Sequence, residues 1–384
     1  MEASHQPVML NEVLSLAEQA FTNINQQNLQ GFRIVDGTTG AGGHSLSLAG
    51  HYLESRMILC DRDQQMLNRA RTNFQQAGLN PDDSRFFWFN GRASEIPASF
   101  LNDSQPNLNT EDTQIAEISP DWQSERPFED TAEGTSQEDS EENSGGLNQF
   151  SSDNEISKIQ NGAAEIGLDF ALLDLGISML HLKEFERGFS YEDSTLDMRL
   201  DTNIDDSAQD LVNNLPEKAL ANLIYEFGEE RASRKIAHRI VQSRPVESAR
   251  QLAEIIAKAI PGPRNRPHPA RKTFQALRIA VNNELEEAEA AARHLASFLR
   301  PGGILAIITF HSLEDRIIKR CFAELCGAGD SVSRYDAPMI SPEPREVKFE
   351  KAIKKSLAPS REEQDINLAS RSARLRAIRR IIPR

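Results

Sequence analysis

The chain has 384 residues, enough for two or three domains with a sizeable core. It carries 43 Lys and Arg against 58 Asp and Glu, and the formal net charge of −15 argues against a uniformly basic nucleic-acid-binding protein. The charge is unevenly distributed, because residues 103–162 hold 15 acidic and 2 basic residues whereas residues 231–384 hold 30 basic and 17 acidic ones. The sequence therefore predicts a basic C-terminal part and an acidic insert.

Three cysteines, Cys60, Cys321 and Cys326, are too few and too irregularly spaced for a disulfide framework or a zinc site. No other cluster with the spacing of metal ligands is visible, so we expect no metal. The N-terminus has no signal-peptide pattern, and no apolar run approaches the ~20 residues that span a bilayer. These features predict a soluble cytoplasmic protein with no membrane partner.

The N-terminal residues 5–30 predict a helix that leads into a short apolar strand, Ile34 and Val35, which ends in Asp36. A glycine-rich loop follows and the pattern becomes helical from His44. Such a loop lets a ligand approach the backbone, and the free N–H groups of the helix N-terminus favour a negatively charged group. The loop glycines are Gly37, Gly40, Gly42 and Gly43.

The next predicted strand, Met57–Cys60, ends in Asp61, where a carboxylate can accept hydrogen bonds from both hydroxyls of a ribose. The dinucleotide fingerprint would need a third glycine where the chain has Ser45, and a phosphate-binding P-loop is excluded because no G-K-[ST] follows. The pattern predicts a pocket for a nucleoside cofactor other than NAD. A purely structural strand–turn–helix with glycine caps is the alternative.

A helix follows Asp61 with one apolar face and a stop at Gly78, and Phe86–Phe89 predicts a third strand. The apolar face consists of Met66, Leu67, Ala70 and Phe74. Residues 103–162 then interrupt this order. They are rich in Ser, Asn, Gln, Asp and Glu and lack apolar periodicity, which predicts a disordered insert. The alternative that this acidic tract mimics nucleic acid or shields the basic part stays open.

The alternating order resumes with an apolar strand, Phe170–Leu173, that ends in Asp174. A run of short amphipathic helices follows, with starts predicted at Ser207, Pro216 and Ser248. These helices are consistent with a small helical domain inserted into an α/β domain whose sheet is wound in parallel.

The C-terminal part returns to the α/β order. It contains a stiff basic connector at 261–272, one long helix over Phe274–Leu299, a turn at 301–303 and an apolar strand over Ile304–Thr309 that leads into His311. The spelling of Ser312 and Asp315 is that of a capping box at the start of a last helix. A strongly basic tail, SRSARLRAIRR, follows.

Four predicted strands end in Asp36, Asp61, Asp174 and Thr309, the last followed closely by His311. In a parallel sheet, ligands bind at the carboxyl ends of the strands, so these side chains are expected around one crevice. For Asp174 the alternative is that it caps a nearby helix.

Nine blocks of the sequence carry a family resemblance: HQPVMLNEV (5–13), DGTTGAGGHS (36–45), DRD (61–63), LLDLGIS (172–178), ERGFSYEDSTLDMRLD (186–201), EFGEER (226–231), HPARKTFQALRIAVNNELE (268–286), PGGILAIITFHSLEDRIIKR (301–320) and SRSARLR (370–376). In these blocks the chain resembles the bacterial small-subunit ribosomal RNA cytosine-N4 methyltransferases, the RsmH/MraW family. The resemblance covers nearly the whole chain in order and leaves out the acidic segment.

The resemblance implies an α/β fold, a Rossmann-like class I S-adenosylmethionine-dependent methyltransferase with an inserted small helical domain and a disordered acidic insert. It implies methylation of the N4 amine of one cytidine in 16S rRNA near the decoding centre, so the expected partner is the small ribosomal subunit. The oligomeric state is left open, a homodimer included. Carried over by position, the donor would contact Gly42, Gly43, His44, Asp61 and Asp174. The candidate donor site also includes Asp36, Gly40, Ala93 and His181.

The sequence departs from the family pattern at Ala93, where the pattern has Phe, and at 178–181, where SMLH replaces SSPQ. A contact to adenine is then expected to be lost or to come from Phe89, Arg92 or His181. The block DSTLDMRL also differs from the pattern DGPLDMRM. These departures bear on donor affinity more than on the identity of the donor.

The predicted domains are a first methyltransferase part (1–102 and 163–182), the acidic insert (103–162), an inserted helical substrate-recognition domain (183–270) and a second methyltransferase part with a basic C-terminal tail (271–384).

The N4 lone pair of cytosine is delocalised into the ring, so the enzyme must orient the amine and stabilise positive charge as it develops on nitrogen. Asp174 is the predicted acceptor of an N4 hydrogen. His311 is a second candidate, for proton removal or for positioning the base, and the alternative is that it caps the following helix.

The substrate side is expected in the block 186–201, where charged and aromatic side chains follow the strand that ends in Asp174. The candidates are Arg187, Phe189, Tyr191 and Arg199, with packing alone as the alternative. Contacts to phosphates are expected from Arg264, Arg266, Arg271, Lys272 and the Arg371–Arg380 cluster. For the tail, an ordinary solvated basic helix is the alternative.

Two rival functions remain. The first is a DNA amino-methyltransferase. Such enzymes typically carry [DNS]-P-P-[YFW] at the strand end where this chain has Asp174-Leu175-Gly176-Ile177, so the sequence disfavours this rival. A ribosome-assembly or RNA-binding factor that kept the fold and lost catalysis would explain Ala93, Leu180 and His181.

Overall fold

The computed structural model describes residues 7–26, 31–102, 167–183, 186–260, 268–328 and 347–383. The acidic insert at 103–162 and the connector residues Arg264 and Arg266 lie outside the described residues. Within the described ranges, no helix combines the length and the apolar character needed to cross a membrane.

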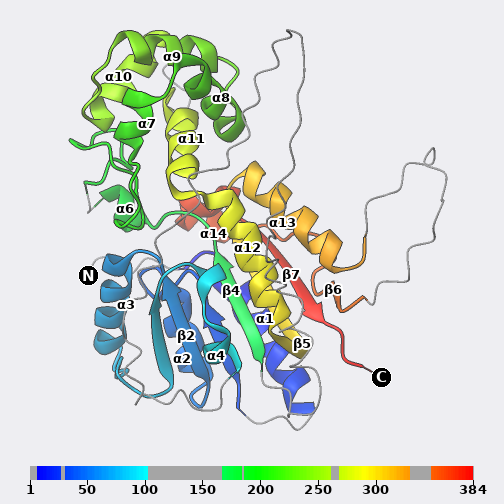
Figure 1. The fold of residues 1–384 in the computed structure, drawn as a ribbon. Coiled ribbons are helices and arrows are strands. Elements are labelled where there is room, and N and C mark those ends of the chain that lie inside the picture. The colour runs from blue at the N-terminus through cyan, green and yellow to red at the C-terminus, as the bar shows by residue number, and fades with distance from the viewer. Residues whose placement is uncertain are drawn as a thin grey trace, which may run out of the picture. The chain divides into compact units, whose positions relative to one another are not determined.

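In the described part of the chain, seven strands form one sheet in the order β3-β2-β1-β4-β5-β7-β6 (Figure 1). The first five in this order are parallel: β3 (Phe86–Asn90), β2 (Arg56–Asp61), β1 (Arg33–Asp36), β4 (Leu168–Asp174) and β5 (Leu299–Thr309). β7 (Arg374–Arg380) runs antiparallel to β5, and β6 (Phe349–Lys351) runs antiparallel to β7. The predicted α/β fold with a parallel sheet is confirmed, and an antiparallel edge is added to it.

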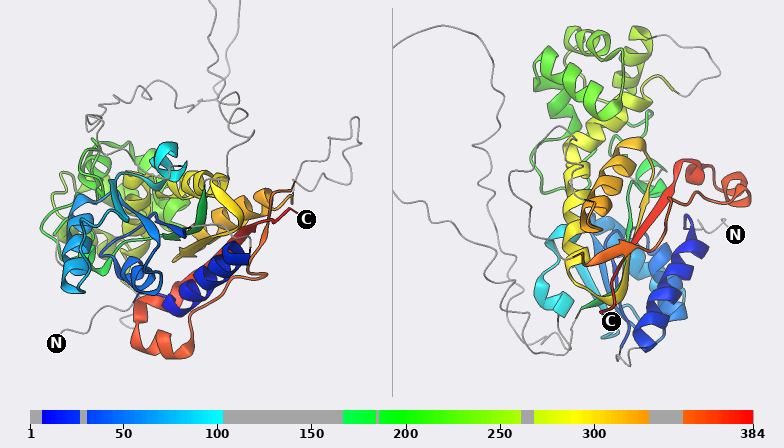
Figure 2. Two further views of the ribbon diagram at one scale, coloured as in Figure 1. Left: turned by 90° about the horizontal axis from the view of Figure 1, so that it is seen from below. Right: turned by 90° about the vertical axis from the view of Figure 1, so that its right-hand side faces the viewer.

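Helices cover both faces of the sheet (Figures 1 and 2). Successive residues of a strand point to opposite faces, and β1 shows this division. Ile34 packs in the cluster with α1 (Leu10–Gln26), α2 (Gly43–His51) and Phe74 of α3 (Gln64–Gln76). Val35 packs in the cluster with α4 (Ala98–Asn102), α12 (Glu284–Ser297) and α13 (Ser312–Leu325). β4 and β5 are covered on both faces, and their residues are buried along nearly the whole length of each strand.

A third hydrophobic core is formed by the helices that follow β4. They are α7 (Ala208–Asn214), α8 (Glu217–Gly228), α9 (Ser233–Gln242), α10 (Ala249–Ala259) and α11 (Arg271–Asn282). Ser207 and Ser248 cap α7 and α10 through their hydroxyl groups, as the sequence predicts. Sheet and helices belong to one compact unit, and the domain boundaries at 183 and 270 stay predictions. The remaining short elements are η1 (Ala93–Glu95), α6 (Met179–Lys183), α14 (Arg361–Ile366) and η2 (Leu368–Ser372).

The predicted single helix over Phe274–Leu299 is wrong, because the chain forms two helices, α11 and α12, that meet at Asn283. Asn283 adopts φ 49 and ψ 40, the left-handed conformation that Asn tolerates better than most residues. Beside it, the side chain of Asn282 accepts a hydrogen bond from the Leu200 N–H and donates to the Met198 carbonyl. The break therefore places an amide that holds the 186–201 block.

The basic tail is not a solvated basic helix, because Arg374–Arg380 form β7 and only the first residues of the tail belong to the short helix η2. Its sequence alternates basic and apolar residues, and Leu375, Ala377 and Ile378 are buried against the sheet. Arg376 pairs with Asp315, and Arg379 pairs with Glu350. Much of the positive charge that the sequence assigned to phosphate contacts is thus used within the fold.

Candidate donor and catalytic site

The carboxyl ends of four neighbouring strands meet at one edge of the sheet, as the sequence predicts. β2, β1, β4 and β5 are adjacent and parallel, so Asp61, Asp36, Asp174 and Thr309 end neighbouring strands in that order. The glycine-rich loop leaves this edge between Asp36 and α2. The arrangement places the loop, the acidic side chains and the start of α13 around the same end of the sheet.

Two glycines of the loop are required by close packing. A Cβ at Gly37 would lie 2.6 Å from Leu173 Cδ2 and 2.9 Å from Ala93 Cβ. Gly42 has φ +86, in the left-handed region that an L side chain rarely adopts, and a Cβ there would lie 3.2 Å from Ala70 Cβ. Ala93 is therefore a buried packing partner of the loop, and its predicted place beside the donor stays a prediction.

Asp36 holds the glycine-rich loop in place through hydrogen bonds. Its carboxylate accepts hydrogen bonds from the Ser45 hydroxyl and from the Thr38 N–H. Burial raises the pKa of Asp36 to about 6, and the charge of Asp61 adds to the effect, while the hydrogen bonds from Ser45 and Thr38 oppose it. Ser45, at the position where a dinucleotide fold has its third glycine, thus serves to hold the loop.

Asp61 is oriented by the backbone on both sides. The Gly40 N–H donates to its Oδ2 at 2.8 Å, and the Asp63 N–H donates to its Oδ1 at 2.9 Å. Burial raises the pKa of Asp61, and these N–H donors and the nearby His181 counteract the rise. A carboxylate held this way retains lone pairs for further donors, such as the two hydroxyls of a ribose.

Asp63 is an important residue that sequence reasoning missed. Its Oδ2 accepts from His181 Nε2 at 2.9 Å and from Arg187 Nη1 at 2.6 Å, and all three side chains are buried. Burial alone would raise the pKa of Asp63, but the hydrogen bonds and charges of His181 and Arg187 hold it below its ordinary value. The motif DRD contained the signal, since its second Asp also caps α3.

Several predicted contact residues are engaged in this network. His181 accepts from the Ser178 N–H at Nδ1 while Nε2 faces Asp63, so both ring nitrogens have protein partners. The Arg187 guanidinium also donates to the carbonyls of Arg199 and Leu200. Phe189 packs in the helical core. These positions favour the packing alternative for Arg187 and Phe189 over direct contact with a substrate.

The remaining predicted substrate residues lie nearer the surface. Arg199 forms a bidentate pair with Asp197, Tyr191 stacks on the exposed His268, and Lys272 Nζ donates to the Glu229 carbonyl. Arg271 begins α11 with an exposed side chain. Their contact with a substrate stays a prediction.

His44 and Asp174 face each other at the donor loop. His44 Nε2 lies 2.9 Å from the Val8 carbonyl, which assigns the ring proton to Nε2 and leaves the Nδ1 lone pair 3.5 Å from Asp174 Oδ2. Burial lowers the pKa of His44 to about 4, so the ring is neutral. Burial, together with the charges of Asp36 and Glu314, raises the pKa of Asp174 well above its usual value. Asp174 Oδ1 is buried and has no hydrogen-bond partner among the described residues.

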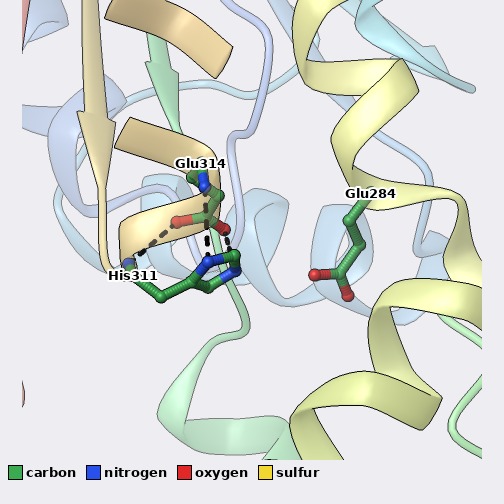
Figure 3. A group of neighbouring side chains, drawn as sticks. All are labelled: Glu284, His311 and Glu314. Atoms are coloured by element: carbon green, nitrogen blue, oxygen red, sulfur yellow. Dashed lines mark hydrogen bonds and ion pairs between the residues drawn. The ribbon is translucent and has the colours of Figure 1, made fainter. Parts of the chain in front are cut away.

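His311 caps α13 together with Glu314, which also corrects the predicted capping box at Ser312 and Asp315 (Figure 3). His311 Nδ1 accepts from the Glu314 N–H, and Nε2 lies 3.0 Å from Glu314 Oε1. With its Nδ1 lone pair occupied, the ring has no lone pair left for a substrate proton. The geometry therefore favours the alternative that His311 positions α13.

Glu284 completes a cluster that no sequence spacing revealed. One ring nitrogen of His311 and one carboxylate oxygen each of Glu284 and Glu314, atoms of the kind that can bind a metal ion, lie within 4.8 Å of one another. Arg278 Nε lies 2.9 Å from Glu284 Oε1, and the charge of Glu284 keeps the pKa of Arg278 raised although burial opposes this. Burial would raise the pKa of Glu314, but His311 and Arg278 keep it low. Because Arg278 compensates the carboxylates, the cluster fits a buried charge network that supports the catalytic edge.

Comparison with known proteins agrees with this geometry. A family model described as the MraW methylase family matches residues 2–103 and 138–381. The chain belongs to the MraW methylase family. This MraW-type chain is 33% identical over 99% of its length to the ribosomal RNA small subunit methyltransferase H of Leptospira interrogans serogroup Icterohaemorrhagiae serovar copenhageni (strain Fiocruz L1-130), covering 90% of that protein.

Proteins of the same name in two other bacteria have similar identity to this chain. In Granulibacter bethesdensis (strain ATCC BAA-1260 / CGDNIH1) the identity is 34% over 98% of the chain and 91% of the relative. In Methylorubrum extorquens (strain PA1) it is 34% over 98% of the chain and 87% of the relative. Membership of a methylase family agrees with a methyl-donor site at the loop edge.

Proposed function

We propose that this methyltransferase transfers a methyl group from S-adenosylmethionine to the N4 amine of a cytidine in 16S rRNA of the small ribosomal subunit. The names of the relatives, which specify the small-subunit ribosomal RNA, support the substrate class. The observation that carries the chemistry is the buried, unpartnered Oδ1 of Asp174 at the end of β4, beside the glycine loop.

The residues at the loop edge fit a cationic nucleoside donor. The N–H groups of Gly40 and Asp63 orient the Asp61 carboxylate, whose remaining lone pairs suit the hydroxyls of a ribose. Asp36 and Asp174 are carboxyl groups whose pKa values are raised by burial and by neighbouring acids. A sulfonium charge placed near them compensates these acids and shifts Asp174 toward its ionised form.

The donor supplies an electrophilic methyl group, so the N4–C bond forms as the S–C bond breaks and N4 gives up one proton. Asp174 Oδ1 accepts the N4–H hydrogen bond, which orients the nitrogen lone pair toward the methyl group. In its ionised form Asp174 also stabilises the positive charge on N4 and takes the proton. The neutral His44 ring presents its Nδ1 lone pair to the other carboxyl oxygen, Oδ2, at 3.5 Å, so it can accept a hydrogen bond from Asp174 only while that carboxyl group is protonated.

The test combines donor binding with product analysis. We expect S-adenosylmethionine to bind in calorimetry and the protein to form N4-methylcytidine in small subunits that lack the mark, detected by mass spectrometry of nucleosides. Asp174→Ala is expected to abolish transfer while donor binding persists. Asp174→Asn, which keeps an acceptor oxygen but cannot take a proton, serves as the matched control and is expected to retain only a small fraction of the activity.

Two outcomes contradict the proposal. Wild-type rates in Asp174→Ala would remove the assigned role of this carboxylate. Donor binding without formation of N4-methylcytidine would favour an assembly factor that kept the fold.

A further inference from the structure

A basic groove lies between α13 and the antiparallel edge of the sheet, with a volume of about 640 Å³. Of its twelve lining residues seven are Lys or Arg, and none is Asp or Glu. α13 forms one wall, and β6, β7 and the turn after β6 form the other, which Figure 2 shows side by side in its right-hand view. The sequence did not indicate this groove, because its walls come from segments far apart in the chain.

Part of this charge is balanced and part is not. Arg316 pairs with Glu229, Arg320 with Glu289, and Arg376 with Asp315. Among the described residues, no ion pair is formed by the four lysines of the groove, so their charge is available to a ligand. They are Lys319, Lys351, Lys354 and Lys355.

The groove adjoins the catalytic edge. Arg316 lies one turn after the His311 cap of α13, and its partner Glu229 also accepts a hydrogen bond from the Ser312 hydroxyl at 2.8 Å. An RNA strand that runs from Asp174 past the start of α13 would therefore meet the groove at Arg316. A row of cations leading away from a reaction centre suits a polyanion longer than the reacting nucleotide.

We infer that this groove binds the phosphate backbone of the RNA strand that continues from the target nucleotide, an inference that rests on the proposed RNA substrate. Phe322, the aromatic residue among the lining residues, is buried, so the groove offers no exposed ring on which a base could stack. Recognition here is through charge, independent of sequence and dependent on salt. A concave wall on two sides favours a strand over the flat surface of an anionic membrane.

The experiment neutralises one lysine on each wall, Lys319→Gln with Lys354→Gln, and measures the affinity of the full-length protein for an unmodified small-subunit rRNA fragment across a salt series. Each lost phosphate contact lowers the slope of log K against log salt by about 0.7, so the pair is expected to lower it by about 1.4 and to weaken binding roughly tenfold near 0.15 M salt. The matched control is Arg56→Gln with Arg69→Gln, exposed cations on β2 and α3. The control is expected to keep the wild-type slope.

An unchanged slope in the groove pair, with methyl transfer intact, overturns the inference and leaves the proposed function standing. An equal loss in the control pair also overturns it, because the effect is then one of net charge. Loss of binding to anionic phospholipid vesicles, with RNA binding unchanged, would instead assign the groove to a membrane surface. RNA binding that depends on the groove in a protein without methyl transfer would contradict the proposed function alone.

Discussion

Asp36 and His44 occupy the same loop and have opposite pKa shifts. Burial raises the pKa of Asp36 from 3.8 to about 6 and lowers that of His44 from 6.5 to about 4. The folded protein therefore binds a proton on Asp36 more tightly than the unfolded chain does. This binding stabilises the folded state below pH 3.8, and the stabilisation is lost as the pH rises through 6. His44 stabilises the fold above pH 6.5, and that stabilisation is lost as the pH falls toward 4.

Each shift corresponds to about 3 kcal/mol, so the two contributions nearly cancel between pH 4 and 6.5 and single substitutions should reveal them. Relative to wild type, Asp36→Asn is expected to gain about 3 kcal/mol in unfolding free energy from pH 4 to 6. His44→Gln is expected to lose a similar amount from pH 4 to 6.5. Urea unfolding at several pH values measures both differences, and curves that run parallel to wild type would contradict the assignment.

Asp63 is a second residue whose buried surroundings determine how much its carboxylate contributes to the stability of the fold. Asp63→Ala leaves the buried Arg187 without its ionic partner and removes the cap of α3, so we expect a loss of about 3–5 kcal/mol in unfolding free energy. Asp82→Ala is the control, since it breaks an exposed pair with Arg71 and should cost less than about 1 kcal/mol. Denaturant unfolding of both variants makes the comparison, and equal losses would contradict the structural role of Asp63.

The elements that the sequence predicted well are those with local signals. β1, β2 and β4 are short apolar runs that end in an acid, and α3, α7 and α10 carry their own caps. The break at Asn283 and the strand β7 were not predicted, because each depends on distant partners. Asn282 is held by the 186–201 block, and β7 gains its hydrogen bonds from β5.

The candidate site shows the same limit. The strand-end acids Asp36, Asp61 and Asp174 could be found because parallel strands bring their ends together. The roles of Asp63 and Glu284 could not, since their partners Arg187 and Arg278 are found only by knowing how the chain folds back. Arg187 was predicted as a substrate contact because a basic residue next to aromatic residues gives the same sequence pattern whether its side chain faces the solvent or the core.

The strand β7 can be tested as an element. Leu375 is fully buried between β5 and the helices, so Leu375→Ala is expected to lower the unfolding free energy by about 2–5 kcal/mol. Leu368, which is 63% exposed in η2, provides the control, and Leu368→Ala should change it by less than about 0.5 kcal/mol. If both variants unfold like wild type, the tail does not contribute a strand to the core.

At the scale of the whole molecule, hydrogen bonds connect Arg62 and Asp63, which follow β2, to the 186–201 block. Arg187 joins Asp63 to the carbonyls of Arg199 and Leu200, and Arg62 donates to the Asn282 carbonyl. Asn282 in turn holds Leu200 and Met198. Binding of a nucleoside at Asp61 is therefore expected to stiffen the block predicted to face the substrate.

Charge acts over a longer range than these contacts. Removing residues 103–162 takes away 15 acidic and 2 basic residues, which changes the net charge from −15 to −2. A less negative chain repels RNA less, so we expect the deletion variant, joined by a glycine–serine linker, to bind the rRNA fragment more tightly at low salt. The difference should vanish near 1 M salt, where the screening length falls to about 3 Å.

A second variant keeps the segment but replaces its Asp and Glu by Asn and Gln; it should match the deletion, because the effect is one of charge. If it binds like wild type while the deletion binds more tightly, the segment acts through its length and the electrostatic explanation is wrong.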